Sequence, residues 1–96
     1  MNFSFHPEAE NEFNKAIDYY EEMELGLGYD FAQEVYSTII RSVKLPKAWT
    51  VLDGDIRRSL VRRFPYGVLY SEEQEGIFII AVMHLHRNPG YWKQRK

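Results

Sequence analysis

The sequence contains no cysteine. A chain without thiols forms no disulfide, builds no cysteine-ligated zinc site and uses no cysteine nucleophile, so these classes of small protein are excluded. The absence of cysteine also agrees with a reducing compartment. Only four prolines and six glycines occur, and none lies in a low-complexity tract or an internal repeat.

Long hydrophobic runs are missing as well. The longest, residues 77–83, is far shorter than the roughly 20 residues that a membrane-spanning helix needs. The first residues, Met1 to Pro7, include no lysine or arginine and no long apolar run, so no signal peptide is expected. We therefore expect a cytoplasmic protein without membrane attachment.

The residues that are present suffice for one folded domain, residues 1–96. The chain is 45% hydrophobic and 16% aromatic, which is too rich for a disordered chain. Its charges are divided: residues 1–56 hold four Lys/Arg against eleven Asp/Glu, and residues 57–96 hold eight against three. This change from −7 to +5 predicts an acidic flank and a basic face suited to a polyanion, although charges also cluster by chance.

The first half predicts a strand and a helical hairpin. Residues 2–6 alternate as a short strand, and Pro7 suits the first turn of a helix, where Glu8, Glu10 and Glu12 complement the helix dipole. The apolar stripe of this helix is Ala9, Phe13, Ala16, Ile17 and Tyr20. Gly26-Leu27-Gly28 ends it. A second stripe, Phe31, Val35, Ile39 and Val43, predicts a helix from about residue 29 to residue 44, which Pro46 stops.

The second half predicts three strands. Residues 47–54 are expected to be a connection that Trp49 and Leu52 anchor to the core. Residues 56–63 alternate, so Arg58 and Arg62 share one face of a strand. Residues 66–70 form the next strand, residues 71–76 an acidic hairpin connection, and residues 76–83 the central, most buried strand.

The element order β-α-α-β-β-β predicts an α+β fold. Sequential strands with short links pair as an antiparallel meander, and the two-helix hairpin packs on one face of this mainly antiparallel sheet. The other face is left partly open and carries the arginines.

Several short motifs follow one another along the whole chain. They are Tyr19-Tyr20-Glu21, Gly26-Leu27-Gly28, Pro46 with Trp49, Arg57-Arg58, Phe64-Pro65-Tyr66 leading to Tyr70, and His84-Leu85-His86-Arg87-Asn88-Pro89-Gly90-Tyr91-Trp92. Their order and spacing resemble the RelE/ParE superfamily, the toxins of type II toxin–antitoxin systems, in the style of the ParE-labelled branch.

This resemblance implies the RelE-like fold, no cofactor, and a cognate antitoxin that wraps the sheet and helices. RelE-like members cut ribosome-bound mRNA without a metal, whereas ParE-like members inhibit DNA gyrase and are not nucleases. We predict first a metal-independent, ribosome-dependent mRNA endoribonuclease, and as the alternative a non-enzymatic gyrase inhibitor. A decayed toxin that only binds its antitoxin is a third reading.

The resemblance places the catalytic residues of a nuclease at Arg62, Arg87 and Tyr91. His84 and His86 are added from the sequence itself, since they stand two residues apart at the end of a strand and histidine titrates near neutral pH. The ordinary alternative for His84 is a hydrogen-bonded core or rim residue, whereas His86 is expected to be exposed. With no cysteine and no clear third ligand, this His-x-His pair predicts no metal site.

Binding of substrate or antitoxin is assigned to four further residues, Arg57, Arg58, Arg63 and Trp92. An acidic antitoxin tail would neutralise arginines of the basic face through charge-assisted hydrogen bonds. The alternatives are a solvated charge for Arg57 or Arg58, protection of a sheet edge by Arg63 and packing of the C-terminal tail by Trp92. Only Lys47 lies between Pro46 and Arg57, so the lysine-rich stretch of RelE-like nucleases is thin here.

Overall fold

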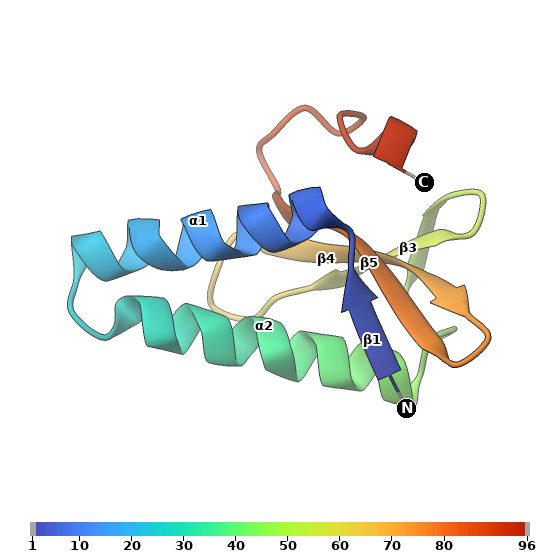
Figure 1. The fold of residues 1–96 in the computed structure, drawn as a ribbon, viewed down its shortest axis with the longest axis horizontal. Helices are drawn as coiled ribbons and strands as arrows, with labels where there is room; N and C mark the ends of the chain where they lie inside the picture. Colours follow the sequence, from blue (N-terminus) through green and yellow to red (C-terminus); the bar gives the residue numbers. More distant parts are fainter. Residues whose placement is uncertain (1, 96) are drawn as a thin grey trace.

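The computed structural model describes residues 2–95. The elements are β1 (Asn2–Phe5), α1 (Pro7–Met23), α2 (Leu27–Lys44), β2 (Thr50–Asp53), β3 (Ile56–Leu60), β4 (Tyr66–Glu73), β5 (Gly76–His84) and a 3-10 turn at Lys93–Arg95. The two helices form a hairpin against a sheet with the strand order β1-β5-β4-β3-β2 (Figure 1). Only β1 and β5 pair in parallel. This arrangement confirms the predicted α+β class.

The link between the helices is fixed by hydrogen bonds. The carboxylate of Glu21 accepts from the backbone N–H of Gly26 at 2.9 Å and of Gly28 at 3.0 Å. Gly26 has φ 90°, a left-handed conformation that glycine adopts without strain. A Cβ on Gly28 would lie 2.6 Å from the carbonyl oxygen of Ile17, so the glycine allows the helices to approach closely. α2 therefore begins slightly earlier than predicted, at Leu27.

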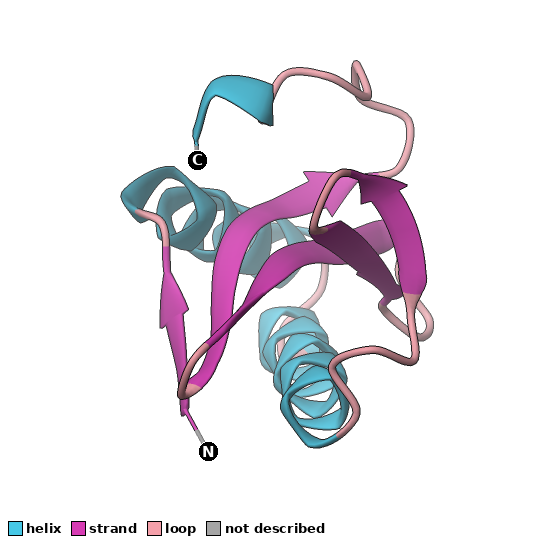
Figure 2. Ribbon diagram, turned by 90° about the vertical axis from the view of Figure 1, so that its right-hand side faces the viewer, coloured by secondary structure: helices cyan, strands magenta, loops and turns pink. Residues whose placement is uncertain are grey.

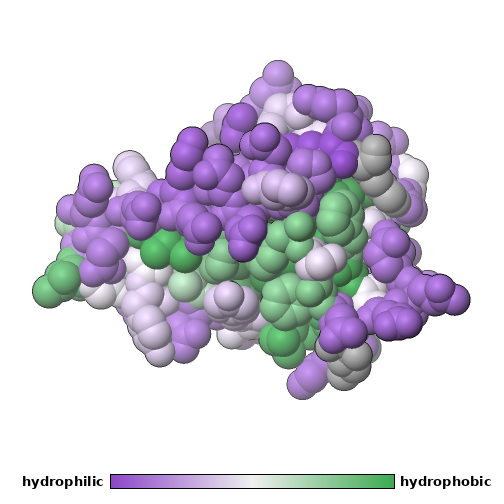
Figure 3. Space-filling model, in the orientation of Figure 1, coloured by the Kyte–Doolittle hydropathy of each residue, from purple (hydrophilic) through white to green (hydrophobic). Residues whose placement is uncertain are grey.

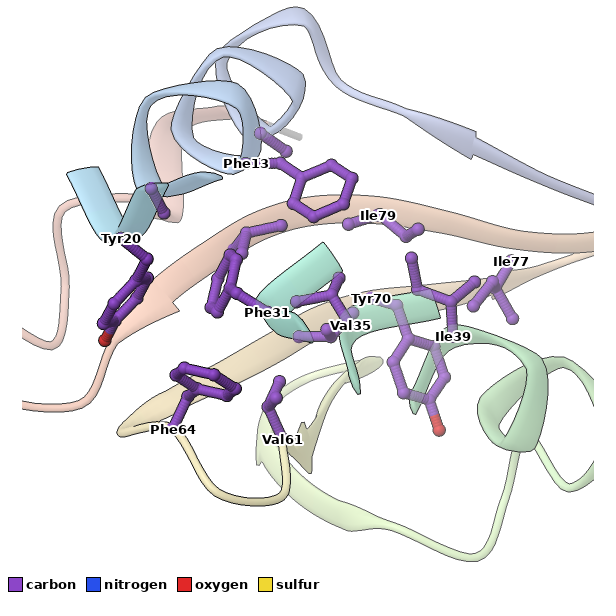
Figure 4. Packing of buried hydrophobic residues seen from close by; sticks show 14 residues of the cluster. Phe13, Tyr20, Phe31, Val35, Ile39, Val61, Phe64, Tyr70, Ile77 and Ile79 are labelled. Carbon is purple, nitrogen blue, oxygen red and sulfur yellow. The ribbon is translucent and has the colours of Figure 1, made fainter. Parts of the chain in front are cut away.

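The main core lies between the helices and the sheet, as Figure 4 shows. The helical stripes predicted from spacing line it. Phe31 is fully buried, and Phe64 meets the rings of both Phe31 and Tyr20 edge to face, with centroids 5.1 and 4.9 Å apart. Tyr70 is also fully buried and donates its hydroxyl to the carbonyl of Pro46 at 2.7 Å. This bond ties the exit of α2 to the middle of the sheet.

The opposite face of the sheet carries a second core. Its buried members are Ile56, Leu69, Ile80, Ala81, Met83 and Trp92. Trp92 comes from the C-terminal segment, which crosses this face on the side away from α2 (Figure 2). The face is less covered around Leu60 and Leu85, which are exposed.

Three expectations about the sheet need correction. The connection expected at residues 47–54 contains β2, which pairs with β3. All four side chains of β2 are exposed, so no alternation marks it in the sequence. β3 ends at Leu60, before the turn in which Arg63 takes φ 72°. β5 is buried on both faces as expected, but β4 holds the middle position.

Candidate functional site

One carboxylate, that of Glu12 on α1, holds the C-terminal segment. Arg95 donates Nη1 and Nη2 to its two oxygens at 3.0 and 2.9 Å, and Arg87 donates Nη1 at 3.4 Å. The backbone N–H of Val82 on β5 adds a bond of 3.1 Å. The Glu12 side chain is only 13% exposed. Hydrogen bonding to this carboxylate raises the pKa of Arg95.

A β-bulge explains why the carboxylate binds at this point. Leu69 pairs with Ala81 and Tyr70 with Ile79, so Ile80 is the extra residue on β5. Arg95 donates to the carbonyl of Ile80 at 3.1 Å. The Glu12–Arg95 pair thus supplies hydrogen bonds where the ladder is interrupted, as buried backbone groups require.

The ring of Tyr91 lies between the two arginines of this cluster. The guanidinium carbon of Arg87 stands 3.7 Å from the ring centroid and that of Arg95 stands 4.9 Å from it. Burial, reinforced by the neighbouring Glu12 carboxylate, raises the pKa of Tyr91 well above its usual value.

The two histidines lie together, as their spacing predicted. Their ring centroids are 5.3 Å apart, and Nδ1 of His84 accepts the backbone N–H of His86 at 3.1 Å. His84 is half-buried against Tyr66, whereas His86 is exposed. A cavity of about 220 Å³ between α1 and the end of β5 is lined by His84, Arg87, Glu12, Lys15, Tyr19 and Tyr66, among others.

The structure does not join Arg62 to this group. Arg62 is exposed in the turn after β3, and within residues 2–95 no hydrogen bond, ion pair or ring contact links it to another side chain. The candidate catalytic residues therefore divide into a connected set, with Arg87, Tyr91, His84 and His86, and the separate Arg62.

Arg57 and Arg58 point to opposite faces, as predicted. On the helix side, Arg57 donates Nη1 to the carbonyls of Lys47 and Trp49, at 3.1 and 2.8 Å, and so fixes the chain after α2. On the other face, the stem of Arg58 lies over Gly67, where a Cβ would be 3.0 Å from its Cγ. Nε of Arg58 is buried without a hydrogen-bond partner among residues 2–95.

Arg63 and Trp92, the other two binding candidates, make internal contacts. Arg63 faces α2 and lies 3.7 Å from a carboxylate oxygen of Asp30 and 3.8 Å from one of Glu34. Trp92 is buried in the second core. Both placements suit structural roles. Arg57, Arg58 and Arg62 have no carboxylate partner in residues 2–95, and of these Arg57 is already bound by two backbone carbonyls.

Sequence reasoning missed Glu12 and Arg95 as site residues. Glu12 was assigned only to the helix dipole, as one of three glutamates in the same segment. One signal was available, because Glu12 is three residues after Ala9 and four before Ala16, both buried, and so lies on the same helix face. Nothing in the sequence marked Arg95 as its partner, since 83 positions separate the two.

Within residues 2–95, no three His, Asp or Glu side chains gather closely enough to hold a metal ion. Across the same range, neither helix combines the length and apolar content required to cross a bilayer.

Comparison with known proteins identifies the fold. A chain of the chromosomal ParDE TA (toxin–antitoxin) system from P. aeruginosa superposes with a TM-score of 0.74, covering 90% of this chain and 97% of that one, at 12% sequence identity. No family model and no curated protein matches the sequence. The chain therefore has the RelE/ParE-like fold that its motifs predicted.

Proposed function

We propose that this protein is the toxin of a type II toxin–antitoxin pair, and that it arrests growth by binding its target and not by cutting RNA. The fold shared with a ParDE chain and the order of motifs along the sequence support the first part. The second part rests on one observation, the engagement of Glu12 with Arg87 and Arg95.

RNA cleavage at a ribose 2′-hydroxyl needs a base, cations around the phosphate and an acid for the leaving oxygen. Here the carboxylate of Glu12 pairs with Arg95 and also contacts Arg87, so a phosphate placed beside these arginines would have to compete with it. Burial raises the pKa of Tyr91, so its phenol gives up a proton even less readily than an ordinary tyrosine and is poorly suited as the base. The cluster is thus suited to holding the C-terminal segment, and the inferred activity is ParE-like inhibition of DNA gyrase.

The nuclease remains the second candidate because of two observations. Arg62 is exposed and free of any carboxylate within residues 2–95, and His84 lies beside His86 at the mouth of a cavity. An exposed arginine and a histidine pair could supply a cation and a proton donor. Arg87 could assist only in competition with Glu12, which it contacts at 3.4 Å.

Two assays run in parallel on the antitoxin-free protein separate these candidates. We expect inhibition of gyrase supercoiling and intact mRNA in a purified translation reaction followed by primer extension. Ribosome-dependent cleavage that disappears in Arg62→Ala, with normal supercoiling, would overturn the proposal in favour of the nuclease. Arg62→Ala should leave gyrase inhibition unchanged.

The cognate antitoxin is proposed to dock on the open part of the second sheet face. Arg58 lies there beside exposed Leu60 and has no carboxylate partner in residues 2–95. A carboxylate of the antitoxin would pair with its guanidinium. Arg58→Ala should weaken the complex with the product of the adjacent gene at least tenfold, whereas Lys44→Ala, on exposed α2 surface, should not. Equal affinities would move the antitoxin to another face.

A further inference from the structure

Four large apolar side chains are exposed together at the tip of the helical hairpin. They are Tyr19 (59% exposed) and Met23 (61%) of α1, Leu25 (91%) of the link, and Tyr29 (65%) of α2. Figure 1 shows this end of the hairpin projecting beyond the sheet, and Figure 3 shows hydrophobic atoms at the same tip beside hydrophilic ones. Single exposed apolar residues are ordinary, but a group at one projecting end marks an interaction site.

The link at the tip is fixed by hydrogen bonds although it lies outside the core. The Glu21 carboxylate binds the N–H groups of Gly26 and Gly28, and Gly28 packs against the backbone of α1. Leu25 is therefore presented outward from a hydrogen-bonded link. A preorganised apolar surface loses little conformational entropy on binding, which favours recognition.

The charge around the tip is mainly negative, with Arg63 and Lys15 as nearby cations. Residues 16–40 contain six Asp/Glu and no Lys or Arg. The Glu21 carboxylate accepts hydrogen bonds within the link, and the Asp30 carboxylate pairs with Arg63. The other acidic side chains near the apolar group are exposed, namely Asp18, Glu22 and Glu24. Such a surface repels nucleic acid and attracts a basic protein surface.

We propose that this tip, defined by Tyr19, Met23, Leu25 and Tyr29, is the surface that engages the protein target. The complementary site is an apolar pocket rimmed by Lys or Arg. This assignment deepens the proposed function and rests on it, because it takes the target to be a protein. The tip lies at the end of the hairpin, while Arg58 and its proposed antitoxin contact lie on the far face of the sheet.

The test uses the full chain with three variants. Met23→Ser with Leu25→Ser removes the apolar anchors, and Glu22→Lys reverses one rim charge. Leu45→Ser is the matched control, since Leu45 is an exposed leucine (61%) beyond the other end of α2. Each variant is assayed for growth arrest on induction, for gyrase inhibition and for thermal unfolding.

The expected result is a loss of at least tenfold in inhibitory potency for Met23→Ser/Leu25→Ser and a smaller loss for Glu22→Lys. Leu45→Ser should match the wild type, and all variants should unfold normally.

Undiminished growth arrest by the double variant would overturn the inference while leaving the proposed toxin intact. Growth arrest without gyrase inhibition would reject only the gyrase target, and the tip would then be judged on growth arrest. A wild-type chain without effect on growth would overturn both. Concentration-dependent self-association lost in the double variant would instead identify a second copy as the occupant and overturn the target assignment.

Discussion

The carboxylate of Glu12 and the guanidinium of Arg95 form a two-pronged ion pair, with nitrogen–oxygen distances of 3.0 and 2.9 Å, between the first helix and the end of the chain. Both side chains are largely buried, at 13% and 11% exposure. Removing one partner of such a pair leaves an uncompensated charge in a poorly solvated place. The pair is therefore the clearest point at which to test the cluster.

Replacing Glu12 by alanine should lower the free energy of unfolding by about 3 kcal/mol, because Arg95 would lose its partner and the N–H of Val82 its acceptor. Urea unfolding measures the change. Glu10→Ala is the matched control, since Glu10 is exposed on the same helix and should cost less than about 1 kcal/mol. Similar losses in the two variants would show that the Glu12 cluster adds no stability.

The two arginines that bind Glu12 should contribute unequally to the free energy of unfolding. Arg95→Ala should cost roughly 3 kcal/mol, whereas Arg87→Ala, with a side chain 53% exposed, should cost less than about 1 kcal/mol. Arg95→Lys should recover only part of the loss, because an ammonium group cannot reproduce the two parallel bonds. Full recovery by lysine would mean that charge alone matters there.

Ionisation of the buried Tyr70 phenol should lower the free energy of unfolding at alkaline pH. Burial raises the pKa of Tyr70 from 10.0 to about 12, so the folded state favours the neutral phenol. Its contribution is complete below pH 10 and is lost as pH rises towards 12. Tyr70→Phe should lessen this alkaline decline while costing about 1 kcal/mol at neutral pH, since the bond to Pro46 is lost. Unfolding midpoints measured across this range would contradict the assignment if both chains declined equally.

Replacing either glycine of the helical link by alanine should lower the free energy of unfolding, but for a different reason at each position. Gly28→Ala places a Cβ 2.6 Å from the Ile17 carbonyl oxygen, so the helices must separate, at a cost of about 2 kcal/mol or more. Gly26→Ala meets no atom within 4 Å and bears only the strain of φ 90°, about 1 kcal/mol. Thermal unfolding of both variants would check this order. A reversed order would show that the backbone conformation, and not the packing of the helices, limits the link.

The main core was predictable because its signals are local. Phe31, Val35 and Ile39 repeat at helical spacing, and the structure buries all three. Pro46 stopped α2 close to the predicted residue for a steric reason that acts between neighbours. β2 could not be predicted in this way, since its exposed side chains carry no pattern and its only requirement is backbone pairing with β3.

The candidate site was only partly predictable. His84 and His86 were placed together by their spacing, and Arg57 and Arg58 were placed on opposite faces. The sequence could not show that Arg87 and Tyr91 share a cluster with a helix carboxylate, because that contact spans 75 positions. It also could not show that Arg62 stands apart from them.

The sequence by itself determined the helical hairpin, the antiparallel meander and the division into an acidic and a basic half, because propensity, spacing and charge act between neighbours along the chain. Only the tertiary structure decided which arginines pair with a carboxylate and which do not. Arg95 binds both the Ile80 carbonyl at the bulge and the Glu12 carboxylate, which also contacts Arg87. Arg58 and Arg62 remain without a carboxylate partner among residues 2–95.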